Sequence, residues 1–366
     1  MTDKLFNGIY KDKKVFLTGN TGFKGSWLAL WLTKLGAQVH GYSLDIPTKP
    51  SHFELLKLEI DTEFGDILDK KRLHTAIDSF KPDIVFHMAA QPLVRKSYAL
   101  PVETFETNII GTLNVLESCR KAGIRTIINI TSDKCYENKE HLRGYTEDDP
   151  MGGKDPYSAS KGCAELVANS YRHSFFNLNQ YGKSHSTLLA DVRAGNVIGG
   201  GDWADDRLIP DLIKAASINQ KVIIRYPRSI RPWQHVLEPL SGYLQLGWKL
   251  LEGKLEFAQN WNFGPNNESD LTVNEVIERS KKIWDKIDYQ IQESSENFHE
   301  AGLLKLDSTK ARSQLKWSSV WDLNQTFEKT IAWYKNYYLN SQIFSEKDLD
   351  DYIQDAQKAG LAWTII

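Results

Sequence analysis

The chain has 366 residues, of which 41% are hydrophobic and 25% charged, with a formal net charge of −2. This size predicts two domains, and the balanced charge gives no reason to expect nucleic acid or an acidic membrane as a partner. The three cysteines are too few for a disulfide framework, and the nine histidines are not spaced as metal ligands, so we expect no metal. Because the sequence shows neither a signal segment nor an apolar stretch of membrane-spanning length, we expect a cytoplasmic protein.

The first half of the sequence alternates between strand-like and helix-like segments. Short apolar runs at 13–19, 37–45, 82–90 and 124–132 predict strands, and helical apolar spacing at 23–36 and 101–123 predicts helices between them. The alternation predicts an α/β fold of the Rossmann type, which is a doubly wound parallel sheet with helices on both faces. In such sheets, ligands bind beyond the carboxyl ends of the strands.

The regular alternation fades after about residue 190. The region after 270 is mainly helical, with a few short strands and many aromatic residues. We therefore predict a second, smaller α+β domain. The larger domain is expected to span 1–190 and about 233–263, and the smaller domain about 191–232 and 264–366.

A glycine-rich stretch, "TGNTGFKG", connects the first strand to the first helix and contains Gly19, Gly22 and Gly25. Glycines at such a turn let the backbone approach a pyrophosphate, which the helix N-terminus stabilises. Twenty residues later the second strand ends at Asp45, whose carboxylate can accept hydrogen bonds from ribose hydroxyls and would repel a 2′-phosphate. The pattern predicts NAD rather than NADP. The alternative interpretation is a tight turn, followed by a turn residue before Pro47.

The G-x-x-G-x-x-G spacing resembles the short-chain dehydrogenase/reductase superfamily, whose members carry Tyr-x-x-x-Lys on a helix after the fifth strand. "DPYSASKGCAELV" supplies Tyr157 and Lys161, which share one helix face and follow Pro156, where a helix can begin. An ammonium group beside a phenol favours the phenolate, so this tyrosine is predicted to take a proton from a sugar hydroxyl. The pair alone is a weak signal, because Tyr10 and Lys14 have the same spacing and are expected at the surface.

Further segments resemble the extended branch of this superfamily, whose members act on nucleotide sugars. The resemblance implies bound NAD in the larger domain, a nucleotide-sugar substrate in the smaller domain, and a homodimer or dimer of dimers formed through helices around 101–121 and 157–176. It places cofactor contacts in "TGNTGFKG", "GDILD" and "HMAAQ" and at the tyrosine and lysine: Gly19, Thr21, Gly22, Phe23, Gly25, Asp45, Asp66, Ile67, Ala89, Ala90, Gln91, Tyr157 and Lys161.

The same resemblance implies a set of substrate contacts from "ETNIIGT", "RAGNVIGGGDW" and "IRPWQHV". They are Asn108, Arg193, Asn196, Arg207 and Arg231. Arg207 and Arg231 are expected to hold the diphosphate, for which a bidentate guanidinium is suited. For both arginines the alternative is a surface ion pair.

The stretch "TSDKCY" follows a buried strand and places Ser132, Asp133 and Lys134 at its end. In the extended branch the strand-end hydroxyl is the partner of the catalytic tyrosine. Sugar 4-epimerases carry small apolar residues next, whereas 4,6-dehydratases carry an acid and a base, usually Asp-Glu. The Asp-Lys pair found here, together with "GFKGSWLALWL", resembles the branch of the 4,6-dehydratases that acts on CDP-glucose.

The resemblance implies a reaction in which hydride passes from C4 of the sugar to NAD, water is lost from C5 and C6, and hydride returns to C6, supplying deoxysugar biosynthesis. Asp133 would be the acid for the departing 6-hydroxyl. Lys134 would be either the base at C5 or a group that only positions Asp133. The alternatives are a dehydratase of dTDP-glucose or GDP-mannose, a nucleotide-sugar 4-epimerase, and an NAD-sensing regulator, although such regulators typically lose the tyrosine and lysine.

Overall fold

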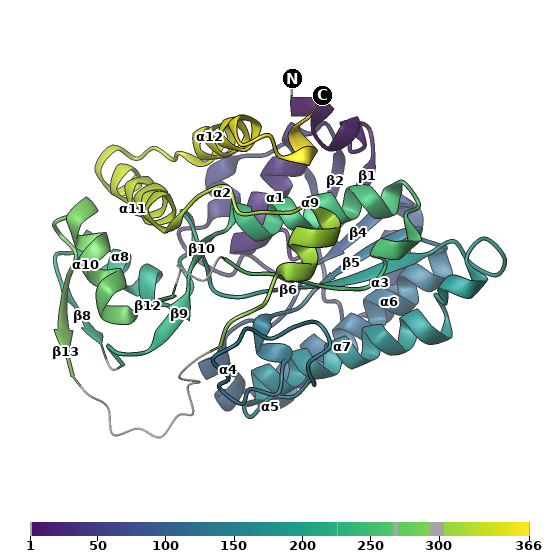
Figure 1. Cartoon of the computed structure of the whole chain (residues 1–366), viewed down its shortest axis with the longest axis horizontal. Coiled ribbons are helices and arrows are strands. Elements are labelled where there is room, and N and C mark those ends of the chain that lie inside the picture. The colour runs from purple at the N-terminus through teal and green to yellow at the C-terminus, as the bar shows by residue number, and fades with distance from the viewer. Residues whose placement is uncertain (1, 225, 266–269, 293–303, 366) are drawn as a thin grey trace.

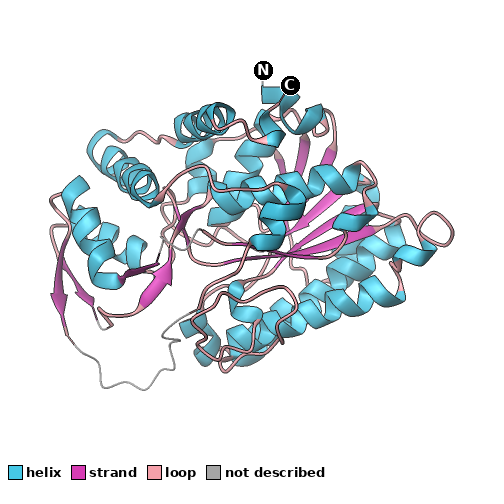
Figure 2. Cartoon of the chain, in the orientation of Figure 1, coloured by secondary structure: helices cyan, strands magenta, loops and turns pink. Residues whose placement is uncertain are grey.

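The computed structural model of the chain describes residues 2–224, 226–265, 270–292 and 304–365. A seven-stranded, all-parallel sheet forms its centre and carries helices on both faces, which confirms the predicted α/β class (Figures 1 and 2). The strand order across the sheet is β11 (Asn260–Phe263), β6 (Leu188–Ala194), β5 (Thr126–Ile130), β4 (Ile84–His87), β1 (Lys14–Thr18), β2 (Gln38–Ser43) and β3 (Asp61–Phe64).

Each face of the sheet is buried under its own set of helices. Because both faces are covered, β4, β5 and β6 are buried at every residue and are largely apolar, although β6 also buries Asp191 and Arg193. Successive side chains alternate between the faces, so Leu17 and Phe16 lie in different cores. The core containing Leu17 packs against α1 (Phe23–Lys34), α9 (Leu237–Leu251) and α12 (Ser345–Lys358), and the other against α3 (Lys70–Phe80), α6 (Gly111–Ala122) and α7 (Pro156–Ser174).

The helix predicted at 101–123 is present but is interrupted. It consists of α5 (Pro101–Phe105), a π-helical turn over Glu106–Ile110, and α6. The π-helical turn contains Asn108, and such turns occur frequently at functional sites. Two further short helices, α2 (His52–Leu56) and α4 (Val94–Ala99), follow β2 and β4.

A further core, separate from the two on the sheet, lies on the left in Figure 1. It is rich in aromatic side chains, and Trp203, Trp284 and Trp333 are buried in it. Its elements are α8 (Leu208–Ser217), α10 (Val273–Ile283), α11 (Leu323–Asn340) and three two-stranded sheets: β7 (Val197–Ile198) with β10 (Gln234–His235), β8 (Lys221–Ile224) with β13 (Asp288–Ile291), and β9 (Ile230–Pro232) with β12 (Asp270–Thr272).

Part of the segment predicted to belong to the smaller domain packs with the sheet instead. Side chains from 311–321 and from α12 lie in the core of α1 and α9. The buried carboxylate of Glu238 on α9 holds them there, because it accepts hydrogen bonds from the backbone N–H groups of Val320 and Trp321 at 2.9 Å and from the hydroxyl of Tyr352 at 2.8 Å. We propose the two-domain division with 311–321 and α12 moved to the larger domain.

Tyr10 is not at the surface, so that prediction was wrong. Its side chain is buried, and its hydroxyl donates to the carbonyl of Leu244 at 2.6 Å. Lys14, which has the same spacing from Tyr10 as Lys161 has from Tyr157, is exposed at the start of β1. The 3₁₀ segment before β1 therefore packs into the core beneath α9, which a reading of strand and helix periodicity does not reveal.

The cysteines are all free thiols, and Cys119 and Cys135 are buried. Over the described ranges, no three side chains of His, Cys, Asp or Glu gather closely enough to hold a metal ion. None of the helices in those ranges combines the length and the apolar character required to cross a lipid bilayer.

Candidate active site

A cleft of about 1040 Å³ opens at the carboxyl ends of the sheet strands. The strand order reverses between β1 and β4, which is the position where doubly wound sheets bind ligands. Residues of the smaller unit, from α8, β8 and β9, form the opposite wall. All of the residues predicted for the site line this cleft, except for Asn108 and Arg193.

The glycine loop is closed so tightly that side chains cannot be accommodated at two of its positions. Gly19 has a φ of +74°, and a Cβ there would lie 2.8 Å from the backbone nitrogen of Ala89. A Cβ on Gly25 would lie 2.0 Å from the carbonyl oxygen of Gly19. The first turn of α1, which begins at Phe23, lines the cleft, so its N-terminal N–H groups are placed to bind an anion.

The end of β2 is hydrogen-bonded to the glycine loop. The hydroxyl of Thr21 donates to the carbonyl of Asp45 at 2.6 Å, and the N–H of Thr21 donates to the hydroxyl of Ser43 at 3.3 Å. The exposed side chain of Asp45 therefore sits next to the glycine loop, and Asp66 lines the same part of the cleft. A glycine loop that can hold a pyrophosphate, with a carboxylate next to it, fits a dinucleotide that has a free ribose 2′-hydroxyl.

Tyr157 and Lys161 lie at the start of α7, which begins at Pro156 with the side chain of Asp155 accepting from the N–H of Ser158. Burial raises the pKa of Tyr157 to about 12, an effect that its hydrogen bond with Ser132 reduces. Burial lowers the pKa of Lys161 to about 8. The sequence predicts that the lysine ammonium favours the phenolate. In the structure, desolvation of the phenol outweighs that effect, so the pKa of Tyr157 is raised and not lowered.

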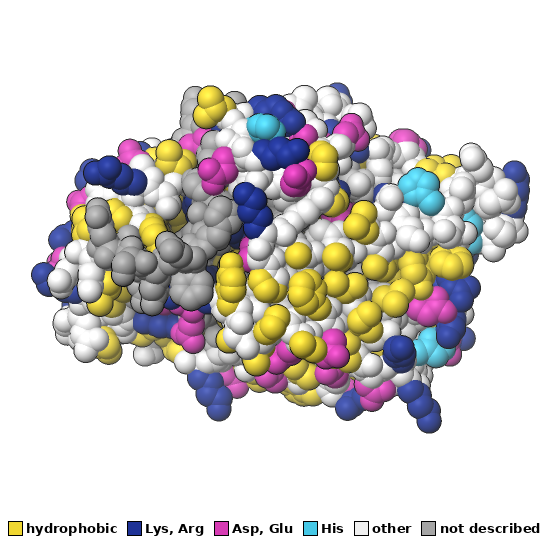
Figure 3. Space-filling model, turned by 90° about the horizontal axis from the view of Figure 1, so that it is seen from below, with side chains coloured by type: hydrophobic (Ala, Val, Ile, Leu, Met, Phe, Trp, Pro, Cys, Tyr) yellow, Lys and Arg dark blue, Asp and Glu magenta, His cyan; other side chains and the backbone are white. Residues whose placement is uncertain are grey.

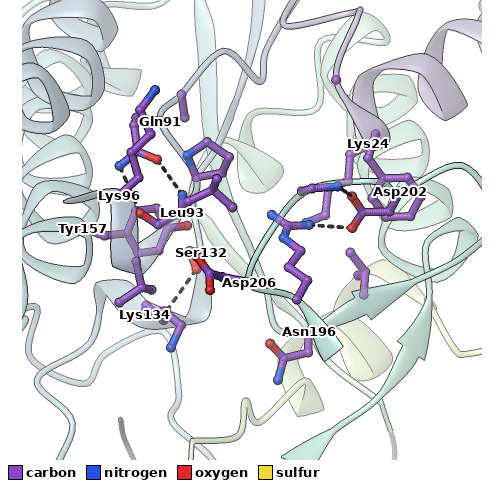
Figure 4. Close-up of a pocket in the computed structure, with 18 of the residues that line it drawn as sticks. Lys24, Gln91, Leu93, Lys96, Ser132, Lys134, Tyr157, Asn196, Asp202 and Asp206 are labelled. Atoms are coloured by element: carbon purple, nitrogen blue, oxygen red, sulfur yellow. Dashed lines mark hydrogen bonds and ion pairs between the residues drawn. The ribbon is translucent and has the colours of Figure 1, made fainter. Parts of the chain in front are cut away.

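The polar groups after β5 form a short hydrogen-bonded turn (Figure 4). The hydroxyl of Ser132 donates to the Asp133 carboxylate at 3.0 Å and accepts from the N–H of Lys134 at 3.2 Å. Asp133 is only 5% exposed, and burial raises its pKa, although Lys134, Ser132 and Lys24 act in the opposite direction. A carboxyl group held this way keeps a proton more readily than an exposed one, which suits a proton donor.

The opposite wall supplies positive charge. Arg207, at the start of α8, pairs with Asp202 at 2.9 Å and also lines the cleft. Arg231 on β9 and Asn196 between β6 and β7 line the cleft as well.

Asn108 and Arg193 do not face the cleft, so their assignment to substrate binding needs correction. Asn108 is 1% exposed; its side chain bonds the backbone N–H and carbonyl of Gln91 at 2.8 and 3.1 Å and the hydroxyl of Ser160 at 2.8 Å. Arg193 is also 1% exposed and forms an ion pair with Glu165. Both side chains use their hydrogen-bonding groups inside the protein, where they position neighbouring segments.

Sequence analysis missed several charged residues of the cleft, and Lys24 and Asp202 are the two that act on its positive charge. Lys24, inside the glycine loop, lines the cleft, and burial, followed by the charge of Arg207, lowers its pKa to about 8. Asp202 holds Arg207 in place. A charged residue between two glycines of a phosphate-binding turn is a signal that could have identified Lys24, whereas nothing in the local pattern distinguishes Asp202 from a loop aspartate.

A family profile described as GDP-mannose 4,6 dehydratase matches residues 16–330, and the chain belongs to this family. CDP-glucose 4,6-dehydratase from Salmonella typhimurium is 51% identical over 96% of this chain and 99% of that protein. UDP-glucose 4-epimerase from Mycoplasma pneumoniae is 25% identical over 89% of this chain and 97% of that protein. These relatives confirm the resemblance that the sequence motifs indicated.

Solved structures agree with the fold. The epimerase Mth375 from Methanothermobacter thermautotrophicus superposes with a TM-score of 0.78 at 22% identity, covering 90% of this chain and 94% of that one. MoeE5 in complex with UDP-glucose and NAD gives a TM-score of 0.74 at 22% identity over 88% of this chain and 99% of that one. At this level of identity the likeness supports the fold alone.

Proposed function

We propose that the chain is an NAD-dependent lyase that converts CDP-D-glucose to CDP-4-dehydro-6-deoxy-D-glucose. One observation carries the proposal: a buried carboxyl group, Asp133, accepts a hydrogen bond from Ser132 and interacts electrostatically with Lys134, in the cleft that also holds Tyr157. Oxidation at C4 requires only the tyrosine, its serine partner and the lysine. Loss of water requires an acid in addition, and Asp133 supplies one.

The cofactor that fits the cleft is NAD. The glycine loop would hold its pyrophosphate, and Asp45 its adenosine ribose. When bound, NAD accepts hydride from C4 of the sugar and returns it to C6.

The first step assigned to the protein is removal of the 4-hydroxyl proton by Tyr157. A buried phenol with a pKa near 12 is protonated at neutral pH and cannot take a proton, so positive charge is needed to favour its phenolate form. Lys161, with a pKa lowered only to about 8, remains an ammonium ion at neutral pH and stabilises the phenolate that accepts the 4-hydroxyl proton. The Ser132 side chain is hydrogen-bonded to the Tyr157 hydroxyl.

The second step is loss of water across C5 and C6. The 4-ketone acidifies the C5 proton, so a modest base is sufficient. Asp133, whose pKa is raised by burial, donates a proton to the departing 6-hydroxyl. Lys134 lines the cleft next to it and either takes the C5 proton or only positions Asp133.

Substrate choice can be tested directly. The purified protein is incubated separately with CDP-glucose, dTDP-glucose, UDP-glucose and GDP-mannose, and the products are analysed for a 4-keto-6-deoxy sugar. Product from CDP-glucose is expected at a much higher kcat/KM than from the others. A C4-epimerised sugar, or preference for another nucleotide, would contradict the proposal, and failure to turn over any sugar while binding NAD would favour a sensor.

Cofactor preference should depend on Asp45. Replacing it with Ala removes the carboxylate that disfavours a 2′-phosphate, so the preference for NAD over NADP is expected to narrow by about tenfold or more. The measurement is the dissociation constant of each cofactor for the wild type and for Asp45→Ala, with Asp69→Ala, a helix N-cap outside the cleft, as the control. Equal binding of NADP and NAD by the wild type would contradict the assignment.

We also propose that two chains pair through α5–α6 and α7. A band of apolar side chains crosses the underside of the molecule (Figure 3). The exposed apolar residues of these helices are Val102, Ile110 and Leu166, at 67%, 39% and 58% exposure. A contiguous apolar surface of this kind marks an interface in many proteins.

The expected result in sedimentation at micromolar concentration is therefore a dimer or a dimer of dimers. Leu166→Glu places a charge in the middle of the face and should shift the protein toward monomer, whereas Leu339→Glu, an equally exposed position on α11, should not. A monomeric wild type would refute the pairing.

A further inference from the structure

One buried ion pair connects the catalytic helix to both ends of the segment that carries the acid. Arg193 on β6 donates through Nε and Nη2 to the two carboxylate oxygens of Glu165 on α7, each at 2.8 Å, and their side chains are 1% and 2% exposed. Glu165 lies one helical turn beyond Lys161 and two turns beyond Tyr157, on the same face of α7.

The pair reaches the "TSDKCY" segment at two points. At its start, the hydroxyl of Thr131 donates to Glu165. At its end, Nη1 of Arg193 donates to the hydroxyl of Tyr136 at 2.5 Å, and the guanidinium lies 4.8 Å from the centre of the Tyr136 ring. The Tyr136 hydroxyl donates in turn to Asn262 on β11 at 2.8 Å. The turn formed by Ser132, Asp133 and Lys134 lies between these anchors.

Stability alone is a poor explanation for this arrangement. A buried ion pair contributes little net stability compared with apolar packing, because desolvation offsets the attraction. The same helix and strand already share a second pair, Arg172 with Asp191, which does not contact the segment from Thr131 to Tyr136. The Glu165–Arg193 pair differs from the Arg172–Asp191 pair in its contacts with the segment from Thr131 to Tyr136, and not in its contribution to stability.

We infer that the Glu165–Arg193 pair is a positioning device that sets Asp133 relative to Tyr157, so that C4 and C6 of one sugar meet their separate catalytic groups. This inference rests on the proposed function.

The two ends of the segment, Thr131 and Tyr136, are not held equally firmly. Thr131 is also fixed by the sheet, where its N–H donates to the carbonyl of Val192 at 2.9 Å. Cys135, at the other end, bonds through its carbonyl to the N–H of Gly152 in a neighbouring loop, and the Tyr136 side chain provides the connection to the sheet. Loosening Tyr136 should therefore displace Asp133 more than Ser132, and slow elimination more than oxidation.

The test is Tyr136→Phe, which keeps the ring and removes the hydroxyl that Arg193 and Asn262 bind. We expect kcat with CDP-glucose to fall about tenfold with KM unchanged, as the loss of two buried hydrogen bonds, one of them to a charged group, implies. In a single turnover, the near-ultraviolet absorbance of the reduced cofactor should rise at the wild-type rate and persist, because oxidation proceeds while elimination is delayed. A purely structural role would lower the active fraction without that signal.

A matched pair of variants separates position from stability. Glu165→Gln and Asp191→Asn each neutralise the carboxylate of a buried pair between α7 and β6, and both should lower Tm. Only Glu165→Gln should also produce the persistent reduced-cofactor signal. Wild-type turnover by Tyr136→Phe would overturn the inference, and so would a persistent reduced-cofactor signal in Asp191→Asn. If Glu165→Gln does not fold, the result with Tyr136→Phe alone tests the inference. A wild type that forms no product from CDP-glucose would refute the proposed function instead.

Discussion

Replacing Tyr157 with Phe should reduce turnover about a thousandfold and leave the bound cofactor oxidised when substrate is added. The phenol hydroxyl is the group placed to take the 4-hydroxyl proton, because it is hydrogen-bonded to Ser132 and lies one turn from Lys161. Without it, no proton leaves as C4 is oxidised, so the first step stops. The measurements are product formation and the absorbance of the reduced cofactor after mixing with CDP-glucose.

Tyr171→Phe is the matched control for this variant. Tyr171 is on the same helix and is also nearly buried, but its hydroxyl donates to Glu117 on α6, outside the cleft. It should keep wild-type kcat, and the lost hydrogen bond should lower Tm slightly. Reduced cofactor appearing in Tyr157→Phe at the wild-type rate would show that another group takes the proton.

Asp133→Asn is expected to behave differently. The amide has the size of the carboxyl group but cannot donate an acidic proton, so oxidation at C4 should proceed while loss of the 6-hydroxyl slows by about a hundredfold or more. Reduced cofactor should accumulate on the enzyme during the first turnover, before the hydride is returned to the sugar. Its persistence is measured by stopped-flow absorbance, and the sugar is identified after quenching.

The contrast between the two variants is the decisive feature. If Asp133→Asn leaves the cofactor oxidised, as Tyr157→Phe should, then Asp133 acts in the first step and the division of roles proposed here is wrong. If Asp133→Asn forms product at the wild-type rate, another group is the acid.

The fold was predictable where local chemistry determines it. The parallel sheet follows from apolar runs that alternate with helical patterns, and the glycine loop follows from steric limits at Gly19 and Gly25 that no other residue satisfies. The course of the C-terminal segment was not predictable, because it depends on long-range hydrogen bonds between Glu238 and Val320, Trp321 and Tyr352. Edge strand β3 was also not predicted, since it is partly exposed and its sequence, "DTEF", is mostly polar.

The candidate site shows the same limit. Groups that follow a strand or open a helix, such as Ser132 and Tyr157, could be located from the sequence because the sheet brings strand ends together. The direction of a side chain within a strand or helix could not. Arg193 lies in a motif that also contains a cleft residue, Asn196, but the pleat of β6 turns Arg193 toward Glu165.

The central claim is that one sugar is both oxidised at C4 and reduced at C6 in a single binding event, and isotope labelling tests it most directly. CDP-glucose carrying deuterium at C4 is converted by the enzyme, and the position of the label is determined by NMR and mass spectrometry. The account predicts deuterium at C6 of the product, with none lost to water or passed to another sugar, and solvent deuterium at C5 when the reaction is run in heavy water. Deuterium returned to C4, with C5 unlabelled and no 6-deoxy sugar formed, would contradict it.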